Sequence, residues 1–303
     1  MAVTTTGNHP KAMWPGVKAW WGRSYEEHKK EYTDLFDMDG SSGKNYEEDV
    51  EVTGFGLAPV KNQGSPIQFD SEVQGTINRY THVAYGLGYI VTREERDDNQ
   101  YEIVSNRRTK ALAFSMNQTK ETVAANHFNR AFNSSYVFGD GVEMISSAHP
   151  TSSGNQSNIL STAADLSEAA LEDMIIQIMG ATNSKGHKIA LMPKSIHVPR
   201  QLWFIANRIL RSTLQTDTAN NNINVIKATS AIPDGIKINH YFTDADAWFV
   251  RTNCPNGLKG YQRTPIEFTQ DNDGDTQNAK AKAYERYVFG VTDWRGIYGT
   301  AGA

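Results

Sequence analysis

The histidines and the single cysteine of this 303-residue chain are the side chains that could act as bases or nucleophiles. Ser147 and His149 lie two residues apart, but such a pair forms a nucleophilic site only when a third group orients the base. Neither a Gly-x-Ser-x-Gly turn nor a His-Glu-x-x-His helix occurs in the sequence. Cys254 precedes Pro255 with no nearby histidine, so we expect a buried or half-buried thiol. The sequence therefore predicts no catalytic residue.

Two short segments resemble ligand-binding loops. The acids of Asp271–Asp275 alternate as in a calcium loop, but Thr276 replaces the required glycine and Lys282 replaces the bidentate glutamate. Gly86 and Gly88 lie among β-forming residues, and neither a third glycine nor a Lys-Ser/Thr pair follows at the spacing of a phosphate loop. We therefore predict a solvated acidic turn, two strand glycines, no metal and no cofactor.

Composition limits the classes of partner. The chain has 30 Lys and Arg against 34 Asp and Glu, a net charge of -4. That balance excludes a basic coat that neutralises nucleic acid. No run approaches the roughly 18 apolar residues of a membrane helix, so we predict no membrane partner. Asn, Thr, Ser and Gln are abundant, which suits contact with further copies of the chain but also suits ordinary β-rich proteins.

Residues 1–49 have the pattern of an arm. Apolar and aromatic residues recur at helical spacing from Val17, and the segment DMDGSSGKNYEED then ends the pattern. The stripe comprises Val17, Trp21, Tyr25, His28, Tyr32 and Phe36. One helix cannot bury such a stripe alone. We expect the arm to lie either on its own subunit or, as we favour, on a neighbour.

The segment from Val50 to Val91 reads as extended chain. VEVTGFGLAPVKN and SPIQFDSEVQ flank a turn-rich centre that contains Pro59, Asn62, Gly64 and Pro66. The pattern predicts a long two-stranded ribbon that is polar on both faces. Such a ribbon has little to bury in its own subunit. We therefore expect it to become ordered against neighbours, mainly through polar contacts.

A long helix is predicted from Thr92 to about Phe132, with a break near its middle. Thr92 and Glu95 form a capping box. The apolar face comprises Ile103, Ala111, Phe114, Ala125, Phe128 and Phe132. The opposite face carries Asn, Gln and basic residues, Lys120 among them, and we expect that face to be solvated.

Helix and strand patterns alternate between about 160 and 255, which is typical of an α/β module. Asp165 is expected to cap a helix over Leu166–Met179, and Pro199 to open another. KIALMP, INVIKAT, IKINHYF and AWFVRT are the expected strands. From Leu258 to Ile297 the chain reads as β again.

This order of arm, ribbon, long helix, α/β module and returning β tail resembles the major capsid proteins of tailed bacteriophages, Mu-like head subunits included, which have the Hong Kong 97-type fold. The match is closest from Asp140 to the end; the first half matches by arrangement more than by motif. The segments that carry it are DGVEMISSAHPTSSGNQSN, DLSEAALEDMI, KIALMPKSIHVP, TANNNINVI, INHYFTDADAWFV and GLKGYQRTPIEFTQDNDGDTQNAKAKAYERYVFGVTDWRGIYG.

The resemblance implies an α+β Hong Kong 97-like fold. Its parts would be an N-terminal arm over 1–49, an extended E-loop hairpin over 50–80 and a peripheral domain with a long spine helix over 81–160. An α/β axial domain over 161–255 would follow, and 256–303 would return to the peripheral-domain sheet.

The resemblance also implies a function. The chain would be no enzyme and would self-assemble as hexamers and pentamers into an icosahedral head that encloses double-stranded DNA without sequence-specific contact. Its location would be the virion, after assembly in the host cytoplasm. Because the arm is short, a separate scaffolding protein is implied, besides a portal protein and a decoration or cement protein.

The expected inter-subunit contacts lie in the arm and the ribbon. They are Trp14, Trp20, Trp21, Tyr25, Phe55, Lys61, Asn62 and Phe69. Some relatives cross-link Lys to Asn covalently, but Lys61 and Asn62 are more simply polar turn residues. Two alternatives stay open, namely an encapsulin-like compartment shell and a small-molecule enzyme that uses the α/β module.

Overall fold

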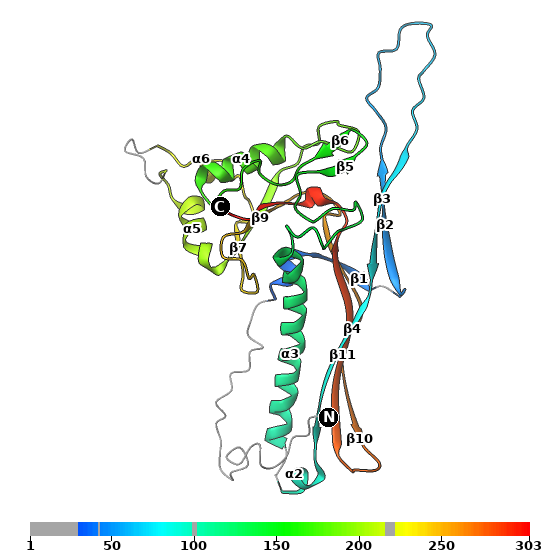
Figure 1. Cartoon of the computed structure of the whole chain (residues 1–303), viewed down its shortest axis with the longest axis vertical. Helices are drawn as coiled ribbons and strands as arrows, with labels where there is room; N and C mark the ends of the chain where they lie inside the picture. Colours follow the sequence, from blue (N-terminus) through cyan, green and yellow to red (C-terminus); the bar gives the residue numbers. More distant parts are fainter. Residues whose placement is uncertain (1–29, 42, 99–101, 216–221) are drawn as a thin grey trace.

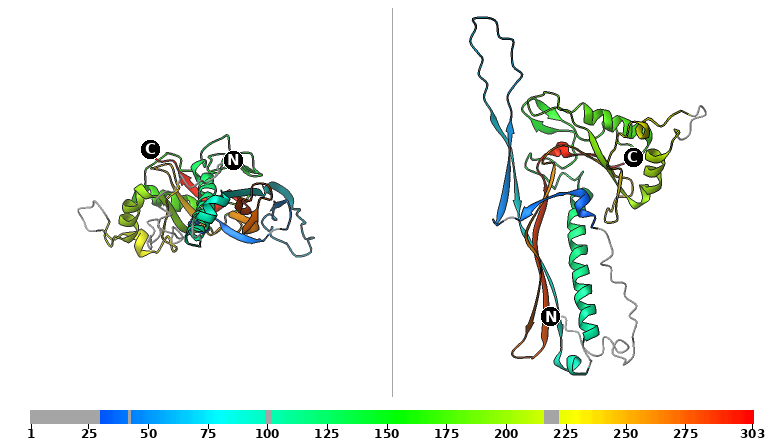
Figure 2. Two further views of the ribbon diagram at one scale, coloured as in Figure 1. Left: turned by 90° about the horizontal axis from the view of Figure 1, so that it is seen from below. Right: turned by 180° about the vertical axis from the view of Figure 1, so that it is seen from behind.

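The computed structural model describes residues 30–41, 43–98, 102–215 and 222–303. A compact module lies at the upper end of a long stem, and a two-stranded ribbon projects beside the module (Figure 1). The stem consists of one sheet and the helix α3, which run side by side in both long views (Figure 2). No helix of the described residues is long and apolar enough to cross a membrane.

The stem sheet has the strand order β1-β10-β11-β4. Its strands are β1 (Asp37–Ser41), β10 (Leu258–Asn272), β11 (Ala279–Val291) and β4 (Val83–Val91). β1 runs parallel to β10, whereas the other neighbours are antiparallel. Alternate residues of β11 are buried from Ala281 to Phe289, the period of a strand with one covered face. The β tail and the two strand glycines, Gly86 and Gly88, are confirmed, whereas β1 was not predicted.

Helices α2 (Arg93–Asp98) and α3 (Glu102–Asn129) correspond to the predicted long helix. The Glu95 N–H donates to Thr92 Oγ1 at 3.2 Å, as the capping box predicts. α3 covers the sheet with Leu112 and Met116, which pack with Ala283. The prediction of a solvated opposite face was wrong at Lys120, which is buried, and the expected apolar Ala111 is exposed.

The upper module is built on a second sheet with the order β12-β9-β7-β8. Its strands are β12 (Ile297–Thr300), β9 (Trp248–Thr252), β7 (Pro193–Pro199) and β8 (Ile236–Asn239). The helices are α4 (Glu168–Met179), α5 (Trp203–Arg211), α6 (Val225–Ala228) and the 3₁₀ turns Arg200–Leu202 and Trp294–Gly296. Leu171, Met174 and Ile178 of α4 form its core with Trp248 and Val250. A small hairpin, β5 (His149–Thr151) with β6 (Gly154–Gln156), lies beside it.

Several predicted details of this module were wrong. Ser167, not Asp165, caps α4, because its side chain accepts from the Ala170 N–H. INVIKAT contains α6 instead of a strand, because the Asn224 side chain caps a helical turn at Lys227. The strand expected at KIALMP begins only at Pro193. At the end of the chain, β12 joins this second sheet rather than the stem sheet.

The ribbon pairs β2 (Tyr46–Thr53) with β3 (Val73–Thr81) in antiparallel register. Val50 lies opposite Ile77 and Thr53 lies opposite Val73. The intervening residues 54–72 form a loop without strand pairing, which extends beyond the module (Figure 2). The predicted ribbon is therefore confirmed, but its paired strands lie nearer the body than expected.

The described end of the expected arm packs on its own chain. α1 (Tyr32–Leu35) is a single turn, so the predicted helix is described over these four residues only. Phe36 contacts Phe128 of α3 edge-on at 5.9 Å and Phe289 of β11 at 4.9 Å, centroid to centroid. The expectation that Tyr32 and Phe36 cross to a neighbour is therefore wrong. Trp14, Trp20, Trp21 and Tyr25 lie outside the described residues.

One buried carboxylate attaches this segment to α3. Glu121 accepts the Glu31 N–H at 2.9 Å and the Tyr32 N–H at 2.8 Å. Burial raises the pKa of Glu121 to about 7, and the Glu31 carboxylate acts in the same direction, whereas the two N–H donors and Lys120 oppose it. Because the folded chain holds this proton more tightly than the unfolded chain, the resulting stability is present below about pH 4.5 and is lost as the pH rises through 7.

We expect the melting temperature of Glu121→Gln, relative to the parent chain, to be higher at pH 8 than at pH 5. The amide nitrogen cannot accept one of the two N–H bonds, but that loss is the same at both pH values. The amide stays neutral, so it removes the cost of burying a charge, a slope of at most ~1.4 kcal/mol per pH unit. Differential scanning fluorimetry across this range would measure the difference. Exposed Glu267→Gln is the matched control and should show no such trend. A pH-independent difference for Glu121→Gln would contradict the prediction.

Candidate functional site

The loop over residues 54–72 is the most exposed part of the described chain, since each of its residues is exposed. Its large apolar side chains are Phe55, Leu57, Val60, Ile67 and Phe69. Val60 and Phe69 are 92% and 96% exposed, almost as in an unfolded chain. Several large, exposed apolar side chains in one loop are typical of a surface that contacts another molecule. The prediction of a mainly polar ribbon was therefore incomplete.

The two limbs of the loop do not pair with each other. They border an open space of about 820 Å³. The hydrogen bonds inside the loop are a turn from Ser65 N–H to the Asn62 carbonyl at 3.1 Å and the contacts of Asp70. Pro59 and Pro66 lack the N–H that strand pairing needs. Recognition through side chains is therefore favoured over the addition of a strand.

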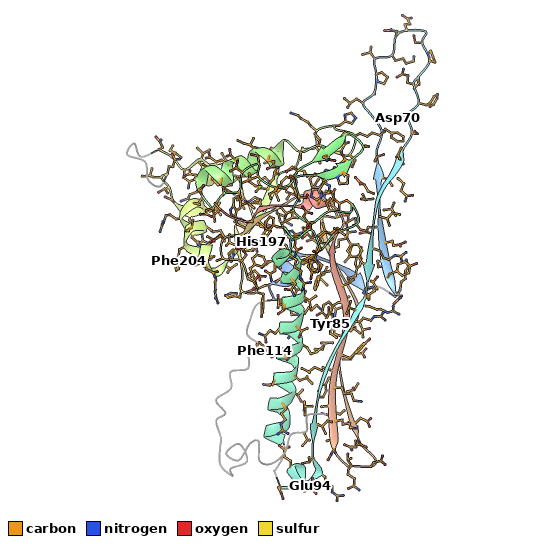
Figure 3. The ribbon with its side chains drawn as sticks, in the orientation of Figure 1. Asp70, Tyr85, Glu94, Phe114, His197 and Phe204 are labelled. Atoms are coloured by element: carbon orange, nitrogen blue, oxygen red, sulfur yellow. The ribbon has the colours of Figure 1, made fainter. Side chains whose placement is uncertain are left out.

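Asp70 holds the root of the loop. Its carboxylate accepts the Gly56 N–H at 2.6 Å and the Ser71 N–H at 2.8 Å, and Lys185 of the module lies 3.0 Å away. The Gly56 N–H and then the Lys185 ammonium lower the pKa of Asp70 to about 2. The carboxylate therefore stays charged and keeps the two limbs together at their root (Figure 3).

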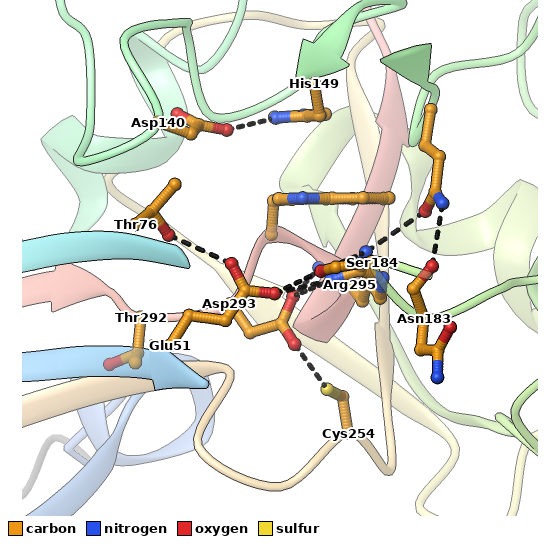
Figure 4. Close-up of polar contacts among 12 residues, drawn as sticks. Glu51, Thr76, Asp140, His149, Asn183, Ser184, Cys254, Thr292, Asp293 and Arg295 are labelled. Atoms are coloured by element: carbon orange, nitrogen blue, oxygen red, sulfur yellow. Dashed lines mark hydrogen bonds and ion pairs between the residues drawn. The ribbon is translucent and has the colours of Figure 1, made fainter. Parts of the chain in front are cut away.

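The ribbon is fixed to the body near its loop end through Glu51 (Figure 4). Glu51 accepts from Thr76 Oγ1 at 3.2 Å and from the Ser184 hydroxyl, and it lies 3.9 Å from Arg295. Arg295 is itself buried and donates to the Thr182 carbonyl at 2.8 Å and to Asp293 at 3.3 Å. These contacts connect the ribbon to the turn before β12.

A second set of contacts fixes the other strand of the ribbon. Asn78 Nδ2 donates to the Thr292 carbonyl at 2.8 Å, and its Oδ1 accepts the Gly139 N–H at 2.8 Å. Tyr80 bonds to the Thr292 hydroxyl. Position 290 requires glycine, because a Cβ atom there would lie 2.5 Å from the Tyr80 ring. The ribbon therefore leaves the body in a fixed direction while its loop stays uncovered.

The structure brings four of the predicted contact residues together. Phe55, Lys61, Asn62 and Phe69 all lie in the exposed loop, but their contacts with a neighbour stay a prediction. Sequence reasoning missed the anchor residues Glu51, Asn78, Tyr80, Thr292 and Arg295. One signal could have indicated that β2 faces the body. Acids lie at every second position of the strand, and all three are half-buried, namely Glu47, Asp49 and Glu51.

The residues considered for catalysis have structural contacts. His149 Nδ1 lies 2.6 Å from Asp140, its Nε2 lies 3.0 Å from Asn158 Oδ1, and its ring stacks on Trp294 at 4.4 Å. Ser147 is exposed and does not bond to it. Both ring nitrogens are therefore engaged.

Cys254 and the acidic turn are likewise explained by local contacts. Burial, and then the nearby Asp293, raise the pKa of the Cys254 thiol, which disfavours the reactive thiolate. Asp273 of the acidic turn pairs with Lys280 at 2.6 Å. No group of three or more His, Cys, Asp or Glu within the described ranges could hold a metal ion.

An exposed loop with apolar side chains, held on a fixed ribbon, is typical of a protein that contacts other molecules. Comparison with known families specifies which kind. Residues 76–300 match the family model described as phage capsid protein, which is well over half of the chain. The chain therefore belongs to the phage capsid protein family, and it is a structural protein of a capsid shell. The resemblance to tailed-phage major capsid proteins is confirmed.

Solved structures agree with the family assignment. The capsid of Myoviridae phage XM1 has a TM-score of 0.57 at 11% identity and covers 100% of this chain and 99% of that chain. The capsid of cyanophage P-SCSP1u gives 0.59 at 11% identity, over 95% and 93%. The capsid of a native GTA particle gives 0.57 at 10% identity, over 100% of both chains. No curated protein sequence matches significantly.

Proposed function

We propose that this chain is the major subunit of an icosahedral head and has the Hong Kong 97-type fold. Its copies assemble as hexamers and pentamers and enclose double-stranded DNA. The observation that carries this proposal is the loop over 54–72, whose apolar side chains are not covered by the described part of their own subunit. A neighbouring copy supplies that cover in a closed shell.

The parts of the fold then take their roles. The hairpin over 50–80 is the E-loop, and α3 is the spine helix of a peripheral domain over 81–160. Residues 161–255 form the axial domain at the centre of each hexamer or pentamer. Residues 1–49 are the arm, and 256–303 return to the peripheral sheet except for β12, which pairs with β9.

The loop residues Phe55, Lys61, Asn62 and Phe69 lie on the neighbouring copy in this arrangement. The apolar members supply most of the buried area, because each aromatic side chain buries a large surface. Trp14, Trp20, Trp21 and Tyr25 of the arm add further contacts between copies.

The remaining partners are proteins that take part in head assembly in the host cytoplasm. A separate scaffolding protein, a portal protein and a decoration or cement protein contact the shell. Its DNA is enclosed without sequence-specific contact, and a net charge of -4 is in keeping with a shell that does not neutralise that DNA. The subunit performs no enzymatic step, in keeping with the structural contacts of His149 and Cys254. The phage family match favours this head over an encapsulin-like compartment.

Electron microscopy of the full chain, produced with and without the scaffolding protein, tests the proposal. We expect capsomers or closed shells in at least one condition. A discrete monomer in every condition would contradict it. Shells that enclose an enzyme cargo instead of DNA would identify the compartment alternative.

A further inference from the structure

Helix α4 carries a solvent-exposed face that the described residues of its own subunit leave uncovered. Leu171, Met174 and Ile178 point into the module, whereas the opposite stripe is exposed. That stripe comprises Ala169, Glu172, Asp173, Ile176 and Met179. Ile176 is 63% exposed between the two acids and Met179. The face is therefore both apolar and acidic, and we refer to these five residues as the α4 face.

Helix α5 carries a face of the opposite charge. Its exposed residues are Phe204, Ile205, Arg208 and Arg211, and Arg200 lies just before the helix; we refer to these five residues as the α5 face. Phe204 is 75% exposed and is seen at the outer end of the module (Figure 3). The described stretches 198–215 and 222–233 contain no Asp or Glu. The α5 face is therefore aromatic and basic.

Within the described part of the chain, neither face is neutralised by an ion pair. Ion pairs among the described residues include none with Glu172, Asp173, Arg200, Arg208 or Arg211. The two helices also contact opposite edge strands of the module sheet. In the order β12-β9-β7-β8, α4 contacts the edge strand β12, whereas α5 contacts β7 and the other edge strand β8.

We infer that the α4 face of one copy docks on the α5 face of the next copy. The inference rests on the proposed function and names the surface that joins neighbouring copies in one ring. Opposite charges on two different surfaces of one chain favour a head-to-tail contact, which closes into a ring when each copy repeats the same rotation. Phe204 and the two arginines of α5 are the residue types that dominate such interfaces. Ile176 and Met179 supply the apolar surface opposite them.

Charge reversal of the full chain tests the contact. Glu172→Arg/Asp173→Arg makes the α4 face basic, and Arg208→Glu/Arg211→Glu makes the α5 face acidic. Each variant alone then places like charges in every contact. We expect the concentration required for ring formation, measured by mass photometry, to rise at least ~10-fold in each case. Phe204→Ala should weaken ring formation without any change of charge.

Combining the reversals gives the decisive result. The variant with all four substitutions restores opposite charges in every contact, so it should form rings of both sizes. An equal mixture of the two double variants can alternate, because one copy has two basic faces and the other has two acidic faces. Rings with an even number of copies then contain only opposite charges, whereas a five-membered ring always contains a like-charge contact. We expect the mixture to form hexamers but not pentamers.

A control separates these faces from the effect of net charge. Glu94→Arg/Asp98→Arg makes the same change of charge in α2, at the far end of the stem (Figure 3), and should form rings as the parent chain does. If the parent chain forms rings, two results would overturn the inference. One is that both double variants still form rings, and the other is that the control variant also fails to form them. A parent chain that forms no ring under any condition would overturn the proposed function, and this inference with it.

Discussion

A chain in which residues 54–72 are replaced by Asn-Gly should fold as the parent does and fail to close shells. Thr53 and Val73 face each other across the ribbon, and Asn-Gly forms the two-residue turn that matches the twist of paired strands. The deleted loop contributes no side chain to the described core. We therefore expect an unchanged melting temperature, and no closed particles in electron micrographs.

Two matched variants identify which side chains of the loop are needed for shell closure. Phe55→Ser/Phe69→Ser removes the aromatic side chains, whereas Lys61→Ser/Asn62→Ser removes the polar tip. Because the aromatic side chains bury more area on docking, the first variant should impair closure strongly and the second weakly. The reverse order would restore the sequence-based expectation of mainly polar contacts. Normal shells without the loop, or an unfolded subunit, would contradict its assignment as the contact element.

The elements whose apolar residues recur at a regular spacing, or whose ends carry capping or turn residues, could be predicted from the sequence. The alternation along β11 and the turn-rich centre of the ribbon identified a β tail and a hairpin. The capping pair Thr92 and Glu95 identified the beginning of the long helix. These signals are local, because each depends on residues within one or two turns or strand repeats. The ribbon, the beginning of the long helix and the β tail were therefore predictable from local patterns.

The elements that depend on distant partners could not be predicted. β1 forms a strand because it pairs with the edge of β10, which lies more than two hundred residues later in the chain. The ribbon anchors Glu51 and Arg295 meet from opposite ends of the chain. Lys120 looked like one of several surface bases on α3, yet it is buried against Glu285 of β11. No pattern within a short window contains these pairings.

Lys120 and Glu285 form the most deeply buried ion pair of the described chain. Each side chain is 4% exposed, and Lys120 Nζ lies 2.5 Å from Glu285 Oε1. Gln262 Nε2 also donates to this oxygen at 3.1 Å. The ammonium lies near the rings of Tyr32 and Tyr287, at 5.0 and 4.8 Å from their centroids. The pair therefore joins α3 to the stem sheet in a place with little water.

Lys120→Met should be among the most destabilising single substitutions in the stem. It leaves the Glu285 carboxylate buried with only the Gln262 amide as a donor, and such uncompensated charges cost about 3–5 kcal/mol. For a chain of this size we expect the melting temperature to fall by roughly 10 °C. Arg93→Ala, which breaks the exposed pair with Asp97, is the control and should cost at most ~1 kcal/mol.

The double variant Lys120→Met/Glu285→Leu distinguishes two explanations of that loss. If the cost arises from an unpaired buried charge, removing the second charge restores most of the stability, because apolar side chains of similar volume pack in the same space. If the attraction itself holds α3 to the sheet, the double variant stays as unstable as the single one. We expect the first result, since the free-energy cost of removing both charges from water offsets much of their mutual attraction. Melting curves of the four chains, parent included, measure the coupling between the two residues.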